Sequence, residues 1–165
     1  SVASRGEKGL DIGIVAKSEV YSVLCIPGSY EKDVESSTSN ILAKVLKLDG
    51  QILIGDKALK HYYNSPDRDF YDLADVWNKK YNLPFVFARL CYNSNEHILK
   101  DLTNKFVRNK VKIPQYILKR YSLRSGISTT NILKYLEKIE YKISHKEKKS
   151  LKLFLKLSKN LPTGE

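Results

Sequence analysis

The sequence has no methionine, one tryptophan and only two cysteines among its 165 residues. No stretch approaches the roughly eighteen consecutive apolar residues that a membrane-spanning helix needs, so no membrane association is predicted. A charged start followed by an apolar run and a small-residue cleavage site is also missing, so no signal peptide is visible. Because even position 1 is not methionine, we expect that Ser1 is not the start of the gene.

The residues that usually bind metals are scattered. Cys25 and Cys91 are far apart, and His61, His97 and His145 stand near neither of them. This spacing does not suit a zinc site, and two cysteines do not make the disulfide framework of a secreted protein. Phosphate-binding loops and the common hydrolase motifs are missing too. We therefore expect no metal or cofactor, no bond between the two cysteines, and a reducing, cytoplasmic setting.

Positive charge is concentrated in the last third of the chain. Residues 1–99 carry a net charge of −1, whereas residues 100–165 carry +12. A basic segment can bind nucleic acid, but 14 of its 17 basic residues are lysines. Specific base recognition favours the planar guanidinium of arginine. Solvated lysine-rich helix faces are therefore the favoured interpretation, with no nucleic-acid partner.

Hydrophobic periodicity predicts an α/β first part and an all-helical second part. Short apolar runs predict strands, and apolar residues spaced by three or four predict helices with recognisable starts and stops. The predicted strands are 11–16, 20–26, 51–54 and 85–91, and the predicted helices are 37–48, 57–63, 72–81, 98–106, 114–126, 132–139 and 144–155. We expect Trp77 and Phe85 to be buried and the lysines of 134–159 to be exposed.

Three groups of residues could form a ligand site. Ser37, Thr38 and Ser39 open a helix, where free N–H groups and hydroxyls can bind a carboxylate or phosphate, although ordinary helix capping needs only one hydroxyl. Gly55 and Asp56 form a turn between a strand and a helix, which could face a cleft or could be a plain capped turn.

The third group is aromatic. Phe85 and Phe87, with Trp77 nearby, could line a pocket for a ring or could simply pack in the core. For each of the three groups taken alone, the structural interpretation is the more common one.

Taken together, these segments resemble a known family. The stretches ILIGDKAL at 52–59 and YDLADVWNKKYNLPFVFARL at 71–90 are similar to the signature of the menaquinone-biosynthesis chorismate dehydratases of the futalosine route. Residues 36–46 resemble the helix start that binds substrate in that family, and residues 12–24 resemble the crossing into its second lobe. The lysine-rich tail resembles the epsilonproteobacterial branch.

The resemblance implies a two-lobed, type II periplasmic-binding-protein-like α/β fold with a helical C-terminal tail. One lobe would comprise residues 1–25 and 85–165, and the other residues 26–84. The family opens with a strand and a Tyr-Leu-Asn-like motif whose Asn lies in the active site. Nothing here corresponds to that motif, so the first lobe is expected to be incomplete and the catalytic residue to precede Ser1.

The implied reaction converts chorismate to 3-[(1-carboxyvinyl)oxy]benzoate and water, without a cofactor. The implied substrate-binding residues are Ser1, Ser37, Thr38, Ser39, Gly55, Asp56, Phe85 and Phe87. Because a fold does not determine a function, a protein that binds a carboxylate ligand without turnover is the alternative.

Overall fold

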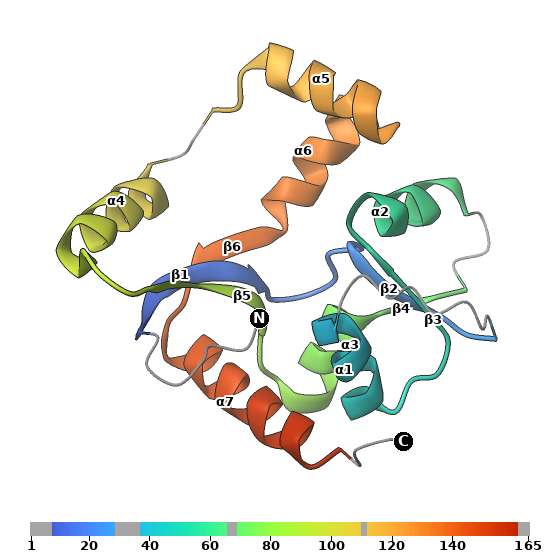
Figure 1. Ribbon diagram of the computed structural model, residues 1–165. Helices are drawn as coiled ribbons and strands as arrows, with labels where there is room; N and C mark the ends of the chain where they lie inside the picture. The colour runs from blue at the N-terminus through green and yellow to red at the C-terminus, as the bar shows by residue number, and fades with distance from the viewer. Residues whose placement is uncertain (1–7, 29–36, 66–68, 110–111, 162–165) are drawn as a thin grey trace.

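The computed structural model describes residues 8–28, 37–65, 69–109 and 112–161 and contains two small antiparallel sheets surrounded by helices (Figure 1). The strands are β1 (Lys8–Ala16), β2 (Val23–Ile26), β3 (Gln51–Ile54), β4 (Tyr71–Asp72), β5 (Phe85–Tyr92) and β6 (Ile139–Lys142). The helices are α1 (Ser37–Leu46), α2 (Gly55–Asn64), α3 (Leu73–Tyr81), α4 (Glu96–Arg108), α5 (Gln115–Ser125), α6 (Thr129–Glu137) and α7 (His145–Lys159).

The first sheet has β1 at its centre, in the order β5-β1-β6. Ala16, the last residue of β1, pairs with Phe85 at the start of β5 and with Ile139 at the start of β6. The three strands therefore meet at one end of the sheet. The chain leaves that end through residues 17–22, which we call the crossing segment.

The second sheet has the order β3-β2-β4, with the four residues of β2 at its centre. All four residues of β2 are apolar or cysteine, as expected for a strand covered on both faces. Val23 pairs with Ile54 at the end of β3, and Leu24 pairs with Asp72 at the end of β4. These residues mark the end of the sheet that receives the crossing segment, and we call it the crossing end.

A buried carboxylate joins the crossing segment to the start of α3. Oδ2 of Asp72 accepts the N–H groups of Val20 (2.8 Å) and Tyr21 (2.6 Å). Its Oδ1 accepts those of Ala74 (2.9 Å) and Asp75 (3.2 Å), which caps α3. Burial raises the pKa of Asp72, and the four N–H groups oppose that shift.

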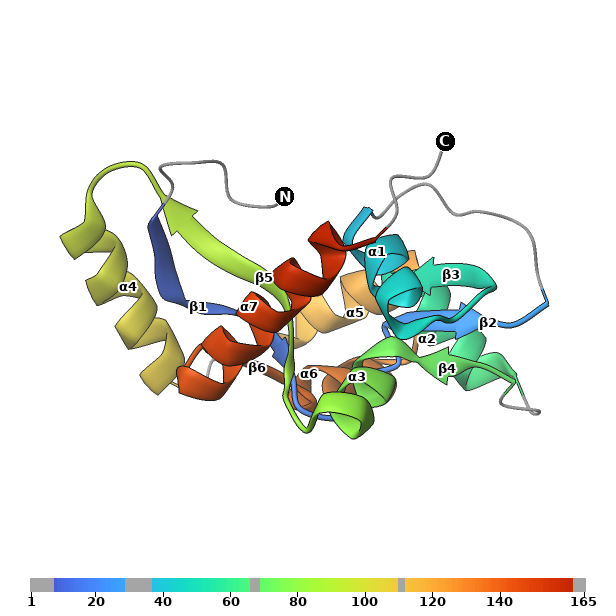
Figure 2. The same cartoon turned by 90° about the horizontal axis from the view of Figure 1, so that it is seen from below.

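One hydrophobic core runs under both sheets. Trp77 and Phe85 are 0% and 1% exposed, so their predicted burial is confirmed. Both rings meet Phe154 of α7 edge to face, and Trp77 Nε1 donates to Ser150 Oγ of the same helix at 3.0 Å. Seen from below, α7 lies between β5 and α1, so the C-terminal helix closes the core (Figure 2).

The lysines of 134–159 mostly point to solvent, as predicted. The exceptions are Lys138 and Lys148, which are half-buried because each pairs with a carboxylate from the first part of the chain. Lys138 contacts Glu19 at 3.3 Å, and Lys148 contacts Asp11 at 2.7 Å. The remaining exposed lysines are those of a solvated helix surface.

The prediction that the second part is wholly helical is wrong at β6. Residues 139–142 form a strand that pairs with β1, although Ile139 continues the apolar spacing of the helix before it. Lys138 caps the C-terminal end of α6, and the next residue, Ile139, is buried in the core. The free edge of β1 needs hydrogen-bond partners, and residues 139–142 supply them by forming a strand instead of extending the helix. The two-residue strand β4 was too short to give a sequence signal.

Both cysteines are free thiols, as expected. Cys25 is buried in β2, and Cys91 lies near the end of β5 in the other sheet. Burial raises the pKa of the Cys25 thiol. In the described ranges, every helix is too short or too polar to cross a membrane.

Replacing Asp72 by Asn should destabilise the whole molecule. An amide has one accepting oxygen, so its NH₂ group would face two of the four N–H donors and leave them unpaired. The free energy of unfolding should fall by about 3 kcal/mol, the scale of losing charge-assisted hydrogen bonds in a buried site. Urea denaturation would measure the loss. Asp75→Asn is the matched control, because Asp75 sits in the same helical turn but pairs with the exposed Lys79. Equal stability of the two variants would contradict this account.

A capping box at the start of α7 predicts sensitivity to acid. Glu147 accepts the N–H of Ser144 at 2.9 Å and also its hydroxyl. Burial pushes the pKa of Glu147 upward, but the hydrogen bonds from Ser144 outweigh it and hold that pKa below its ordinary value of 4.5. Its stabilising contribution is therefore complete above the unfolded pKa and lost as the pH falls through the native one.

Glu147→Gln should lower the free energy of unfolding by about 1 kcal/mol at neutral pH, the usual value of a helix cap. The difference from the wild type should shrink as the pH falls below 4.5. Thermal denaturation across this range would measure it, and a difference that stays constant with pH would be inconsistent with a role for the charge.

Candidate functional site

The start of α1 lies at the crossing end of the second sheet. Only residues 47–50 separate α1 from β3, so the helix and the strand run in opposite directions and the helix begins where the strand ends. Gly50 makes this tight return possible, because a Cβ atom there would come within 2.1 Å of the carbonyl oxygen of Ile26. Helices α1 and α2 lie on opposite sides of the second sheet, with α1 below it and α2 above it in Figure 1, and each contacts β3.

The three hydroxyl residues at the start of α1 differ in exposure. Ser37 is exposed, Thr38 is half-buried and Ser39 is 5% exposed. The first turn of a helix has N–H groups without partners inside the helix, and its dipole favours a negative charge there. Thr38 is the hydroxyl best placed to add a donor while staying accessible, whereas Ser39 belongs to the packed side of the helix.

The turn at Gly55 and Asp56 begins α2. Gly55 has a φ of +56°, a conformation that suits glycine, and its N–H donates to the carbonyl oxygen of Ser22 at 2.8 Å. Asp56 is half-buried, and its Oδ1 accepts the hydroxyl of Tyr121 from α5. Burial and this hydrogen bond raise the pKa of Tyr121 to about 12. The turn is thus tied both to the crossing segment and to α5.

Phe85 and Phe87 lie in the other sheet. Phe85 is packed among Trp77 and Phe154, so it has almost no surface to offer a ligand. Phe87 is partly buried and meets Phe85 edge to face, with the ring centroids 4.9 Å apart. Core packing thus describes Phe85, and only Phe87 keeps accessible area. Ser1 lies outside the described residues.

An aromatic cluster beside the crossing segment was not foreseen. Tyr21 stacks on Tyr62 of α2, with ring centroids 3.7 Å apart and planes within 5° of parallel. Phe70 meets both rings edge to face, and Lys138 lies over the ring of Tyr21 at 5.2 Å. Burial raises the pKa of Tyr21, and the neighbouring Tyr62 raises it further. Tyr21 has a φ of 60°, an unusual conformation for tyrosine that no sequence pattern announced.

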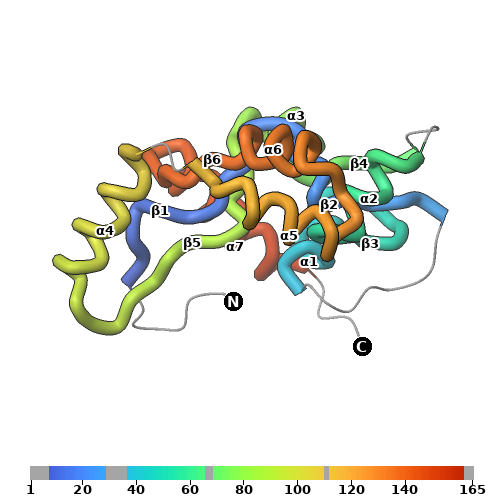
Figure 3. The backbone as a smooth tube through the Cα atoms, turned by 90° about the horizontal axis from the view of Figure 1, so that it is seen from above, coloured from blue at the N-terminus to red at the C-terminus, as the bar shows by residue number. Residues whose placement is uncertain are grey.

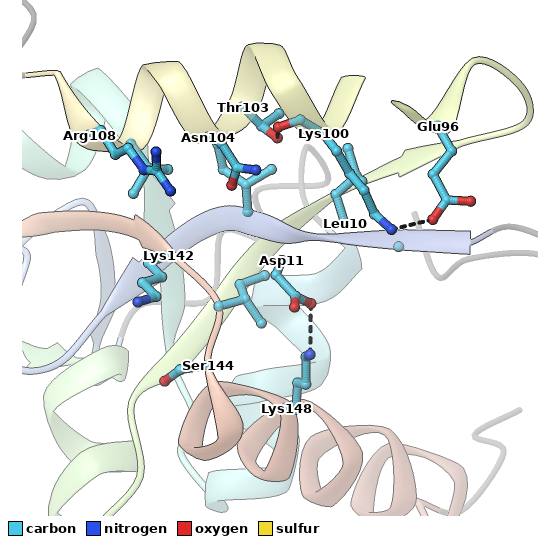
Figure 4. Close-up of a pocket in the computed structure, with 14 residues that line it drawn as sticks. Leu10, Asp11, Glu96, Lys100, Thr103, Asn104, Arg108, Lys142, Ser144 and Lys148 are labelled. Carbon is cyan, nitrogen blue, oxygen red and sulfur yellow. Dashed lines mark hydrogen bonds and ion pairs between the residues drawn. The ribbon is translucent and has the colours of Figure 1, made fainter. Parts of the chain in front are cut away.

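A large cavity lies elsewhere in the described part of the chain. It measures about 610 Å³ and lies between α4, β1 and the start of α7 (Figure 4). Its lining includes two ion pairs, Lys148 with Asp11 at 2.7 Å and Lys100 with Glu96 at 2.5 Å. None of the predicted site residues lines it. The cavity is therefore a second candidate for ligand binding, and its lining also carries the cations Arg108 and Lys142.

In the part of the chain that the structure describes, no three His, Cys, Asp or Glu side chains gather in a way that could hold a metal ion. The predicted site residues supply backbone N–H groups and hydroxyls, together with the carboxylate of Asp56.

Comparison with known proteins shows the family. The chain belongs to the menaquinone biosynthesis family, whose model matches residues 11–160. It is 45% identical, over 161 residues, to the chorismate dehydratase of Campylobacter jejuni subsp. jejuni serotype O:23/36 (strain 81-176). That match covers 96% of this chain and 72% of the relative. The resemblance found in the sequence motifs is thereby confirmed.

Proposed function

We propose that this protein is a chorismate dehydratase, a lyase that converts chorismate to 3-[(1-carboxyvinyl)oxy]benzoate and water in menaquinone biosynthesis. The observation that carries the proposal is the 45% identity to a chorismate dehydratase along 96% of the chain. The geometry adds support, because two helices begin at the same end of one sheet and chorismate carries two carboxylates. The alternative, a carboxylate-binding protein without turnover, has no comparable support.

The proposed architecture is the two-lobed, type II periplasmic-binding-protein-like fold. Each sheet would belong to one lobe, and the substrate would lie between them. The proposed boundary at residue 25 falls within β2, whose pairing partners are β3 and β4. The pairing of β2 therefore favours a boundary in the crossing segment instead. The second proposed boundary, between residues 84 and 85, coincides with the start of β5.

The reaction asks the protein mainly to orient its substrate. Removal of the proton at the ring carbon that bears the ether, with departure of the neighbouring hydroxyl as water, yields an aromatic ring. Formation of the aromatic ring makes the reaction favourable. The protein therefore mainly has to hold the two carboxylates of the substrate in place and exclude bulk water. We assign one carboxylate to the start of α1, at Ser37, Thr38 and Ser39, and place Gly55 and Asp56 at the edge of the same site. Phe87 would form part of the opposite wall, supported from behind by Phe85.

Thr38→Ala should lower kcat/KM for chorismate. The substitution removes one charge-assisted hydrogen bond, worth about 1.5–3 kcal/mol, which corresponds to roughly a tenfold to hundredfold loss. Mass spectrometry of chorismate incubated with the full-length protein would follow the loss of water, and circular dichroism would verify the fold. Thr38 is preferred over Ser39, whose burial would mix a packing defect into the result.

Thr103→Ala is the matched control for Thr38→Ala. It makes the same chemical change on α4, where the hydroxyl donates to the carbonyl oxygen of Leu99 at 2.8 Å and lies beside the large cavity. Normal turnover by the Thr38 variant would place the anion site elsewhere. Loss of turnover in the Thr103 variant alone would move it to the cavity beside α4. Binding of chorismate without conversion by the wild type would favour the non-catalytic alternative.

A further inference from the structure

The helical hairpin formed by α5 and α6 contacts α2 at its start, its middle and its end. At the start of α2, the hydroxyl of Tyr121 donates to Asp56. At its end, the hydroxyl of Tyr63 donates to the carbonyl oxygen of Asn131 at 3.4 Å. Between these two contacts, Leu59 packs in a buried cluster with three apolar residues of the hairpin, Leu118, Ile127 and Ile132. Seen from above, the hairpin spans the middle of the molecule between α4 and α2 (Figure 3).

This docking means that residues from the C-terminal part of the chain control the turn at Gly55 and Asp56. The backbone of Gly55 is held by Ser22, which is itself hydrogen-bonded to Tyr135 of α6. The side chain of Asp56 is held by Tyr121. The side chain of Asp56 is thus held directly by a tyrosine that lies 65 residues further along the chain, and the residue that holds the backbone of Gly55 contacts a second tyrosine, Tyr135.

The electrostatic problem at this turn is the charge of Asp56. Chorismate has two carboxylates, and a third carboxylate at the edge of its site repels it. A repulsion of this kind depends on where the negative charge is directed and on whether a donor partly neutralises it. The phenol of Tyr121 does both, because it directs Oδ1 toward α5 and donates a hydrogen bond to that oxygen.

We infer that Tyr121 is a positioning residue for substrate binding: by donating to Asp56, it holds the carboxylate toward α5 and limits its repulsion of a dianionic substrate. The inference rests on the proposed function, since the substrate it concerns is chorismate. It gives the α5–α6 hairpin a role in binding even though Tyr121 acts on the substrate only through Asp56.

The test is a double-mutant cycle in the full-length protein, with KM and kcat measured for chorismate. Tyr121→Phe should raise KM roughly three- to tenfold, less than the loss of a hydrogen bond made directly to the substrate because Tyr121 acts only through Asp56, and it should leave kcat nearly unchanged. The increase should shrink at high salt, because screening weakens the repulsion. In the Asp56→Asn background, Tyr121→Phe should no longer change KM, because an uncharged amide does not repel the substrate.

Two further measurements make the result specific. Tyr116→Phe is the matched control, since Tyr116 is on the same helix but 71% exposed, and it should leave KM as in the wild type. Phenolate absorbance, compared between the wild type and Tyr121→Phe, should show Tyr121 titrating near 12, and Asp56→Asn should lower its pKa while burial still holds that pKa above its ordinary value. The titration does not depend on activity.

The outcomes separate this inference from the proposed function. If the wild type converts chorismate but Tyr121→Phe has the same KM, the inference is overturned and the proposed function stands. If Tyr121→Phe raises KM equally with and without Asp56→Asn, Tyr121 does not act through Asp56, and the inference is again overturned. If the wild type neither binds nor converts chorismate, the proposed function fails, and this inference fails with it.

Discussion

The arrangement of the two sheets depends on the carboxylate of Asp72. It receives N–H groups from Val20 and Tyr21 on one side and from Ala74 and Asp75 on the other, which joins segments more than 50 residues apart in the chain. A buried carboxylate is costly unless its oxygens are fully hydrogen-bonded, and here each oxygen accepts two bonds. The same group thus caps α3 and sets the direction in which the chain passes between the sheets. The positions of β2, β3 and the two helix starts follow from that direction.

The C-terminal helix supports this arrangement from below. Phe154 packs against both Trp77 and Phe85, and Ser150 accepts the indole N–H that burial would otherwise leave unpaired. The basic last third therefore contributes apolar side chains to the core on one side and presents solvated lysines on the other. These exposed lysines form its outer surface.

The candidate site arises where the two sheets meet. Neither the start of α1 nor the turn at Gly55 is unusual by itself, since helix starts and glycine turns are common. What distinguishes them is that a short return of the chain, made possible by Gly50, brings both to one end of the same sheet. Under the proposed function this meeting point would bind the substrate, and the hydrogen bond from Tyr121 to Asp56 connects it to the α5–α6 hairpin.

Local patterns in the sequence determined most of the elements. The apolar runs at 51–54 and 85–91 predicted strands, Asp72 predicted a helix cap, and Ser144 with Glu147 predicted a capping box, because each of these signals acts within a few residues. The burial of Trp77 and Phe85 followed from the same periodicity. The motifs around Gly55 and Pro84 were also sufficient to identify the family, because they are contiguous stretches of sequence that can be read without the fold.

Only the tertiary structure decided what distant residues do to one another. Ile139 fits a helical stripe equally well, and it became part of a strand because the edge of β1 was there to pair with it. Three contacts join residues more than 40 positions apart in the chain. They are the hydrogen bonds from Val20 and Tyr21 to Asp72, the stacking of Tyr21 on Tyr62, and the hydrogen bond from Tyr121 to Asp56. Such contacts depend on the path of the whole chain, so no short pattern encodes them, and they set the geometry of the candidate site.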